Sequence, residues 1–322
     1  MTLLDPDSHV CIVGCGLIGG SFALALRRAG FKGRLTAWDD PLIVKLAIER
    51  GVVESREDCF DSGSETTAQM VFLAAPIGGI VDFLRCRSRM LPSGTIVTDA
   101  GSTKAEICRV AKSCLPDSVC FIGGHPMAGS EHRGVEYSRA DLFDRATWAL
   151  VRDSSCQLEA DQVVQKIIEL IGARPVWIEP DHHDRAVALV SHLPQIISTT
   201  LATLLANPQP KHSETHPEAA HSESDPSESA EERSVDLARM MAAGGWRDMT
   251  RLAASSFSVW RDIIITNQPY LTHTLDQFIS SLQLLSEALE KRDFQTVRTL
   301  FEEANHSVTQ LRETRYRSFD KV

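Results

Sequence analysis

Short runs of apolar residues alternate with segments of helical spacing through the first 180 residues of the chain. The runs have the length of buried strands, and the segments between several of them place apolar residues three or four positions apart, as amphipathic helices do. The predicted strands are 10–13, 34–40, 70–76, 95–101, 118–124, 148–151 and 174–179. Strands that alternate with helices in this order predict a parallel, doubly wound α/β sheet.

The pattern changes after residue 180, where apolar residues keep helical spacing almost to the end of the chain. Residues 182–206 form one predicted helix, and the helical spacing resumes at 235. The segment 207–234 between them has four prolines, six serines and no apolar residue larger than alanine, which predicts a disordered acidic insertion. We therefore expect an α/β domain of residues 1–180, followed by an all-α domain of residues 181–322 that carries this insertion.

Composition and charge narrow the classes of function. The 322 residues are 43% hydrophobic and 24% charged, which is typical of a globular protein, and the net charge of −10 argues against nucleic acid as a partner. The chain has no run of eighteen apolar residues and starts without the pattern of a signal peptide, so we expect a cytoplasmic protein without a membrane span. None of the eight cysteines forms a CxxC pair, so we expect reduced thiols and no bound metal.

A glycine motif follows the first predicted strand and opens a predicted helix. Gly14, Gly16 and Gly19 give the spacing G-x-G-x-x-G, and Asp39 lies at the end of the second predicted strand. This combination is typical of a Rossmann-type dinucleotide site, in which the helix N-terminus receives the pyrophosphate and the acid accepts the ribose hydroxyls. Asp40 adds a second negative charge that would repel a 2′-phosphate, so we expect NAD rather than NADP. The predicted cofactor-binding residues are Gly14, Gly16, Leu17, Ile18, Gly19, Asp39, Ala75 and Pro76.

Further clusters of polar and small residues follow other predicted strands. They are AAP at 74–76, DAGSTK at 99–104 and GGHPMAGSE at 123–131. The carboxyl ends of parallel strands meet at one edge of a doubly wound sheet, and ligands bind at that edge. The helical half contributes two more motifs, HDRAVALVSHLPQ at 183–195 and GGWRDMTRLAASSFSVWRDI at 244–263.

These five motifs, in this order, resemble those of the prephenate dehydrogenase family, which includes arogenate and cyclohexadienyl dehydrogenases. The resemblance covers nearly the whole chain apart from the insertion at 207–234. It implies a Rossmann-type domain followed by a helical domain that forms a homodimer. It also implies an NAD-dependent oxidative decarboxylation that converts prephenate to 4-hydroxyphenylpyruvate in tyrosine biosynthesis.

Two residues at the strand ends are the predicted catalytic groups. His125 matches the family's catalytic histidine, and a neutral imidazole suits the removal of a proton from a substrate hydroxyl near pH 7. Ser102 matches a family serine that bridges the nicotinamide and the substrate hydroxyl. The alternatives are a packing histidine after a strand for His125, and for Ser102 a helix N-cap in a capping box with Glu106. We interpret Lys104 as an orienting group rather than a base.

The same resemblance supplies the predicted substrate-binding residues. Arg251 matches an arginine that holds the ring carboxylate, for which a guanidinium is well suited, and Arg247 is a weaker candidate. Asp184 matches a residue that gates the pocket, although an acid at a helix start is also favoured by the helix dipole. The full predicted set is Arg251, Ser130, Glu131, Gln195, Ser191, Gly244 and Asp184.

Gln195 departs from the pattern of some prephenate-specific members, which have a histidine at this position. A glutamine amide can donate and accept, so it could meet the keto group of prephenate or the ammonium group of arogenate. We expect prephenate as the substrate, with arogenate or dual specificity as the alternative.

Two other classes of function are less well supported by the sequence. A β-hydroxyacid dehydrogenase would rely on a helical lysine, and the chain has no lysine between 212 and 290. A non-catalytic NAD-binding regulator would not need His125, Ser102 and Arg251 together.

Overall fold

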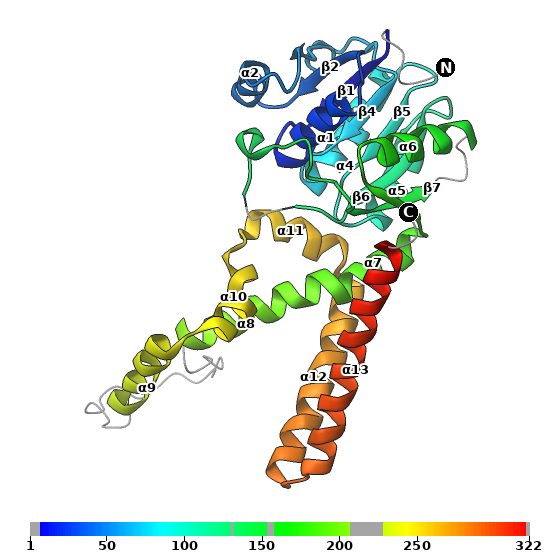
Figure 1. Cartoon of the computed structure of the whole chain (residues 1–322). Coiled ribbons are helices and arrows are strands. Elements are labelled where there is room, and N and C mark those ends of the chain that lie inside the picture. Colours follow the sequence, from blue (N-terminus) through cyan, green and yellow to red (C-terminus); the bar gives the residue numbers. More distant parts are fainter. Residues whose placement is uncertain (1–6, 130–131, 153–157, 207–227, 320–322) are drawn as a thin grey trace, which may run out of the picture. The chain divides into compact units, whose positions relative to one another are not determined.

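The computed structural model describes residues 7–129, 132–152, 158–206 and 228–319. Its N-terminal part is built on one sheet of eight strands in the order β3-β2-β1-β4-β5-β6-β7-β8 (Figure 1). The strands are β1 His9–Val13, β2 Arg34–Trp38, β3 Ser55–Arg56, β4 Met70–Leu73, β5 Ile96–Asp99, β6 Cys120–Pro126, β7 Thr147–Arg152 and β8 Arg174–Trp177. The seven predicted strands are all present. The sheet also contains the two-residue strand β3, which was not predicted because no hydrophobic run marks it in the sequence.

The order in which strands are added to the sheet reverses between β1 and β4. β2 and β3 extend the sheet on one side of β1, and β4 to β8 extend it on the other side. Strand β1 pairs in parallel with β2 on one side and with β4 on the other, so the loops after these two strands diverge. Such a switch point is where doubly wound sheets bind their ligands. The glycine motif directly follows β1, so the fold places it at this point.

One pairing differs from the predicted parallel sheet. β6 and β7 are antiparallel, with His125 opposite Ala149, whereas β7 and β8 are parallel again. An antiparallel pair needs no crossover helix, and the described residues between β6 and β7 contain only the 3₁₀ turn Val135–Tyr137.

Helices cover both faces of the sheet and bury its side chains. The helices α1 Leu17–Arg28, α2 Pro41–Glu49 and α6 Leu158–Leu170 pack on one face, where Phe22 stacks on Phe72 at a centroid distance of 4.1 Å. The helices α3 Cys59–Ser62, α4 Ile77–Arg87 and α5 Ala105–Cys114 pack on the other. Each fully buried side chain of this size contributes about 1.5–3 kcal/mol, so burial on both faces stabilises the doubly wound sheet that was predicted.

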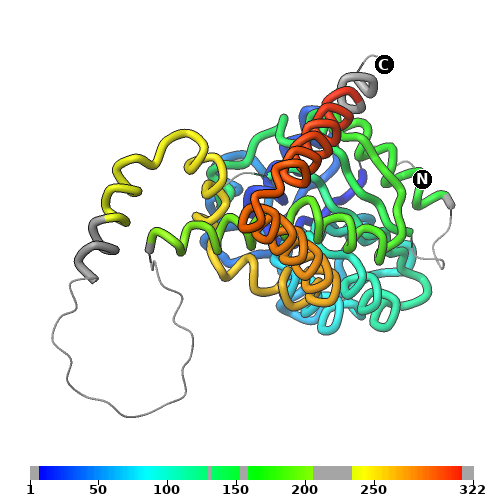
Figure 2. Tube along the Cα trace, turned by 90° about the horizontal axis from the view of Figure 1, so that it is seen from below, coloured from blue at the N-terminus to red at the C-terminus, as the bar shows by residue number. Residues whose placement is uncertain are grey.

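After Trp177 the described residues form helices and turns without a strand, as predicted. They are α7 Pro180–Val187, the π-helical turn Ala188–His192, α8 Leu193–Ala206, α9 Glu228–Met241, α10 Gly244–Thr250, the 3₁₀ turn η4 Arg251–Ala254, α11 Phe257–Thr266, α12 Gln268–Glu290 and α13 Phe294–Phe319. α10 and η4 return along α8 (Figures 1 and 2).

The predicted disordered insertion extends too far at its C-terminal end. Residues 207–227 lie outside the described residues, but 228–234 form the start of α9.

Contacts divide the chain into two compact units, Met1–Gln268 and Pro269–Val322. The second unit contains most of α12 and all of α13, which run in opposite directions as a helical hairpin (Figure 1). The first unit contains the sheet and α7 to α11, including every residue predicted to bind cofactor or substrate.

One helical stretch among the described residues, Pro180–Leu205, is long and apolar enough to cross a membrane when judged by length and mean hydropathy alone. It also carries His183, Asp184 and His192, whose side chains are buried against the rest of the first unit. Buried polar side chains with protein partners are typical of a helix that packs inside a protein.

Candidate active site

The glycine loop after β1 is shaped by close backbone contacts. Gly14 has a φ of +90°, and a Cβ atom on it would lie 2.5 Å from the backbone nitrogen of Ala75. A Cβ atom on Gly19 would lie 2.0 Å from the carbonyl oxygen of Gly14. Only glycine fits at these two positions, so the loop is held against the end of β4, next to Ala75 and Pro76.

The same loop leaves room and hydrogen-bond donors for an anion. A Cβ atom on Gly16 would meet nothing within 4 Å, and the N-cap of α1 makes no side-chain capping bond. Gly16 is the N-cap of α1, whose first residues are Leu17 and Ile18, so this open space lies beside the positive end of the helix. This is the arrangement that receives the phosphates of a dinucleotide.

Asp39 is oriented by the backbone around it. Its carboxylate accepts hydrogen bonds from the amides of Cys15 at 2.7 Å and Asp40 at 2.7 Å. Asp40 caps α2 by accepting from the Leu42 amide at 2.8 Å. The two carboxylates are thus fixed at the end of β2, where the ribose of a bound dinucleotide would lie in this fold.

A buried ion pair joins the ends of β5 and β6. Lys104 and Asp99 are fully buried, and the Lys104 ammonium contacts the Asp99 carboxylate. The ammonium also donates to the carbonyl oxygen of Gly124 at 2.7 Å, and the Asp99 carboxylate accepts from the amides of Gly101 at 2.8 Å and Gly124 at 2.9 Å. Lys104 is therefore an orienting group, as interpreted from the sequence.

His125 lies within β6, although its strand was predicted to end at Gly124. The antiparallel partner β7 continues the pairing to Pro126, opposite Trp148. Pairing with β7 is a tertiary feature, which the apolar run alone does not reveal. The histidine is therefore held by sheet hydrogen bonds rather than by a turn.

A chain of hydrogen bonds connects His125 to Asp184. Nδ1 of His125 lies 2.9 Å from Nε2 of His183, and Nδ1 of His183 lies 2.7 Å from the Asp184 carboxylate. Burial, and after it the electrostatic effects of His183, Lys104 and His192, lower the pKa of His125 well below 6.5. The His125 ring is therefore neutral at neutral pH and able to accept a proton.

Asp184 binds the start of α5. Its two carboxylate oxygens accept hydrogen bonds from the amides of Lys104 at 2.7 Å and Ala105 at 2.9 Å, and the residue is 1% exposed. The Asp184 carboxylate thus caps the N-terminus of α5, where the helix dipole favours negative charge. Ser102 does not cap the helix, because Lys104 occupies the N-cap position without a side-chain bond. Ser102 is partly buried in the loop after β5.

The predicted substrate residues of the helical half lie on neighbouring segments. Gln195 is buried in α8, where its amide nitrogen donates to the carbonyl oxygen of Leu252 at 2.8 Å and to the Thr199 hydroxyl at 3.2 Å. It therefore anchors η4, the turn that begins with the exposed Arg251. Gly244 begins α10 and is exposed, and Ser191 is partly buried in the π-helical turn. Ser130 and Glu131 lie outside the described residues.

Two residues that the sequence reasoning missed make buried or partly buried contacts, Asn267 within the helical half and Asp262 between the helical half and α4. Asn267 donates to the Asp184 carbonyl oxygen at 2.8 Å and to His192 Nδ1 at 3.0 Å, and burial lowers the pKa of His192 to about 4. Asp262 of α11 accepts from the Gly78 amide at the start of α4 at 2.8 Å. One feature of the sequence could have identified His183 as a site residue, namely its position next to Asp184 in the HHDR stretch.

The cysteine prediction was wrong at one position. Cys120 at the start of β6 is disulfide-bonded, whereas six other described cysteines are free. The free thiols include the buried Cys11 and Cys15, and burial raises the pKa of Cys15 to about 12. Among the described residues no group of three or more His, Cys, Asp or Glu side chains could hold a metal ion.

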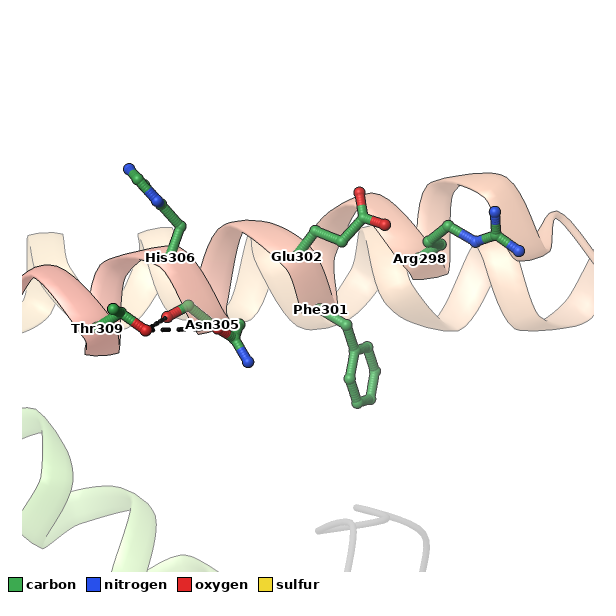
Figure 3. Close-up of a pocket in the computed structure, with 6 residues that line it drawn as sticks. All are labelled: Arg298, Phe301, Glu302, Asn305, His306 and Thr309. Atoms are coloured by element: carbon green, nitrogen blue, oxygen red, sulfur yellow. Dashed lines mark hydrogen bonds between the residues drawn. The ribbon is translucent and has the colours of Figure 1, made fainter.

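The second unit carries a surface groove along α13 (Figure 3). In that view His306 and Phe301 point to opposite sides of the helix, and the Thr309 hydroxyl donates to the Asn305 carbonyl oxygen at 2.9 Å. The groove is lined by Arg298, Phe301, Glu302, Asn305, His306 and Thr309. None of the predicted site residues lies in it.

The chain matches two family models in succession. Residues 22–177 match the model described as prephenate dehydrogenase, nucleotide-binding domain. Residues 179–303 match the model described as prephenate dehydrogenase, dimerization domain. The glycine loop itself precedes the first matched segment.

Curated relatives carry related descriptions. The prephenate dehydrogenase of Bacillus subtilis is 30% identical over 301 residues, which cover 92% of this chain and 74% of the relative. The cyclohexadienyl dehydrogenase of Zymomonas mobilis is 28% identical over 294 residues, which cover 88% of this chain and 89% of the relative.

Solved structures share the fold over nearly the whole chain. The prephenate dehydrogenase of Aquifex aeolicus, in complex with hydroxyphenyl propionate and NAD⁺, has a TM-score of 0.77 and 28% identity, and the match covers 96% of this chain and 98% of that one. The Synechocystis arogenate dehydrogenase has a TM-score of 0.75 and 26% identity, with coverage of 94% and 99%.

The buried ion pair generates the first prediction. We expect Lys104→Met to lower the free energy of unfolding by about 3–5 kcal/mol, because it leaves the Asp99 carboxylate buried without its partner. Urea unfolding of the purified protein measures the change. Lys112→Met, on the exposed end of α5, is the matched control and should stay within about 0.5 kcal/mol of wild type. Equal effects of the two substitutions would contradict the role of the pair.

Proposed function

Because the chain belongs to the prephenate dehydrogenase family, we propose that it catalyses the NAD-dependent oxidative decarboxylation of prephenate to 4-hydroxyphenylpyruvate. The alternative within the family is an arogenate or dual-specificity cyclohexadienyl dehydrogenase. The relatives support both, since they include prephenate, cyclohexadienyl and arogenate dehydrogenases.

The observation that carries the proposal is the neutral His125 imidazole at the ligand-binding edge of the sheet. It lies at the end of β6, and its ring is held by His183. Burial lowers the pKa of His125, so at neutral pH the ring is in the form that accepts a proton. A catalytic base of an alcohol dehydrogenation needs this protonation state.

In the proposed reaction the protein accepts one proton from the substrate. When bound, NAD supplies the acceptor for the hydride that leaves the carbinol carbon of prephenate. His125 accepts the proton of the ring hydroxyl as that carbon becomes a carbonyl. The bond between the ring and its carboxylate then breaks and releases CO2. Its electron pair moves through the ring to the carbonyl oxygen, which takes back a proton and becomes the phenol hydroxyl of the aromatic product. Loss of CO2 is driven by aromatisation, so the protein has to position the carboxylate rather than form a covalent bond to the substrate.

The geometry at the end of β2 supports NAD over NADP. The Asp39 carboxylate is aimed by two backbone amides, and Asp40 lies beside it as the cap of α2. Two carboxylates at this place can accept from ribose hydroxyls but would repel a phosphate group. The open space at Gly16, beside the N-terminus of α1, suits the pyrophosphate.

Arg251 is the proposed partner of the ring carboxylate. It is exposed at the start of η4, and hydrogen bonds from α8 fix that turn, through Gln195 to Leu252 and from the Ala253 amide to Ser198 Oγ at 3.1 Å. Gln195 therefore acts on specificity in part through the position of this turn. We propose that Ser102, Ser191, Gly244, Ser130 and Glu131 complete the surroundings of the substrate.

We also propose a homodimer, formed by the helical domain of residues 181–322 and located in the cytoplasm. The family model that matches residues 179–303 describes a dimerization domain. Large apolar side chains are exposed on α9 and α11, including Met240 at 83% and Phe257 at 70%. Apolar surface of this kind is typical of a face that is covered by another chain.

The direct test is a comparison of NADH or NADPH formation from prephenate and from arogenate, each with NAD and with NADP. We expect the highest kcat/KM with prephenate and NAD. A higher value with arogenate would establish the alternative, and equal use of NADP would contradict the assignment of Asp39. Absence of reduced cofactor in all four combinations would contradict the proposed function itself.

We expect His125→Asn to lower kcat by about 10²–10⁴-fold, the range for the loss of a general base, without loss of NAD binding. Steady-state kinetics and a titration with NAD measure the two effects. His132→Asn is the control, because His132 is exposed and stacks on Tyr137. Turnover of His125→Asn within a few-fold of wild type would exclude this histidine as the base.

We expect Arg251→Ala to raise the KM for prephenate by roughly tenfold or more, because a charge-assisted bond to the ring carboxylate contributes about 1.5–3 kcal/mol. Arg247→Ala, an exposed arginine in the preceding helix α10, should change the KM by less than about twofold. The same KM in both variants would show that the carboxylate is held elsewhere.

A further inference from the structure

Two residues without an assigned catalytic role lie behind the proposed base. We propose that His183 and Asp184 act as a positioning pair that fixes the tautomer of His125, so that its Nε2 is the atom that accepts the substrate proton. This inference rests on the proposed function, in which His125 is the base. It gives these two residues a role that acts through His125.

The positions of the protons follow from the hydrogen bonds. An ionised carboxylate only accepts, and the Asp184 carboxylate already accepts from the amides of Lys104 and Ala105. His183 Nδ1, at 2.7 Å from this carboxylate, must therefore carry a hydrogen and donate it. In the neutral His183 ring, Nε2 is then an acceptor.

The same reasoning applies to the His125 ring. His183 Nε2 lies 2.9 Å from His125 Nδ1, so Nδ1 of His125 carries the hydrogen of this bond. The neutral His125 ring holds only one such hydrogen, and its Nε2 is left with a lone pair. The tautomer is thus set by an aspartate two hydrogen bonds away. A packing histidine would not require such a chain.

Hydrogen-bond donors surround the Asp184 carboxylate at the end of the chain. Asp184 is 1% exposed and receives two amides at the N-terminus of α5, where the helix dipole favours negative charge. His183 is 2% exposed, so water does not compete for its two ring nitrogens. The Asn267 amide holds the Asp184 backbone at 2.8 Å. The pair is therefore fixed from both sides.

The pair of His183 and Asp184 also stabilises the proton that His125 accepts. When His125 Nε2 takes the substrate proton, His125 Nδ1–H can pass its own proton to His183 Nε2. One proton enters the chain and none is lost, so His125 becomes neutral again and His183 carries the positive charge. That charge then lies directly against the Asp184 carboxylate, which stabilises it. The group of residues works as an aspartate behind a histidine does in a catalytic triad.

Two substitutions separate this role from packing. In His183→Gln the side-chain carbonyl oxygen can still accept from His125 Nδ1, because it lies near the place of Nε2, but it cannot take up the proton. In His183→Phe the ring volume is kept and the acceptor is lost. His182→Phe is the control, because His182 is exposed and adjacent in sequence.

We expect His183→Phe to lower kcat by about 10²-fold or more, because a base in the wrong tautomer slows the proton transfer. The KM values for substrate and for NAD should change by less than about threefold, because binding is not weakened. His183→Gln should recover at least a tenfold part of that loss. His182→Phe should match wild type. Equal kcat in wild type and His183→Phe, or no recovery by glutamine, would overturn the proposal.

A second measurement does not depend on activity. Nitrogen-15 NMR of histidine-labelled protein reports which ring nitrogen of His125 carries the hydrogen, and resonances are assigned with His125→Asn. We expect Nδ1–H in wild type and in His183→Gln. Nε2–H in wild type would overturn the positioning role, whatever the kinetics. If wild type shows Nδ1–H but reduces no cofactor with prephenate or arogenate, the proposed function fails while the tautomer assignment stands.

Discussion

The candidate site depends on the buried ion pair between Asp99 and Lys104. Both side chains are fully buried, a position that is unfavourable for charges unless each is paired and hydrogen-bonded. Here the pair has further partners in the backbone of Gly101 and Gly124. The ends of β5 and β6 are thereby fixed relative to each other, and these ends carry Ser102 and His125.

From this pair, polar contacts extend into the helices that follow the sheet. Asp184 of α7 binds the first amides of α5, and Asp262 of α11 binds the first part of α4. The Thr103 and Thr266 hydroxyls form another bond between the two parts at 2.8 Å. The helices α7 and α11 are therefore held at the same edge of the sheet that carries the glycine loop. The residues proposed as the base, the cofactor loop and the partner of the ring carboxylate therefore lie on one compact unit, as the proposed dehydrogenation requires.

Much of this could be predicted from the sequence. The alternation of strands and helices gave the doubly wound sheet, because burial on both faces requires continuous apolar runs. The glycine spacing predicted the loop after β1, because Gly14 and Gly19 allow backbone contacts that no side chain permits. The extension of β6 through Pro126 was missed, since it depends on β7, whose antiparallel pairing no local pattern reveals.

The second histidine of the site was missed for a related reason. His183 and Asp184 are adjacent in an amphipathic helix, and the family resemblance predicts Asp184 as a residue that gates the substrate pocket. Its carboxylate also binds the start of α5, eighty positions earlier in the chain, and no local pattern reveals this contact. The hydrogen bonds of Gln195 could not be predicted from residue type either. Its amide nitrogen donates to the Leu252 carbonyl oxygen and to the Thr199 hydroxyl. Residue type predicts which bonds are available, and only the tertiary contacts show which of them are used.

The buried network keeps His125 neutral and ready to accept a proton. The pH dependence of kcat/KM tests this directly, because it reports the ionisation of essential groups in the free enzyme. His125 is surrounded by His183, Lys104 and His192, and its pKa is lowered well below 6.5. We predict that kcat/KM stays constant as the pH falls through 6.5 and decreases only at more acidic pH. A decrease centred at or above pH 6.5, lost in His125→Asn, would contradict the account.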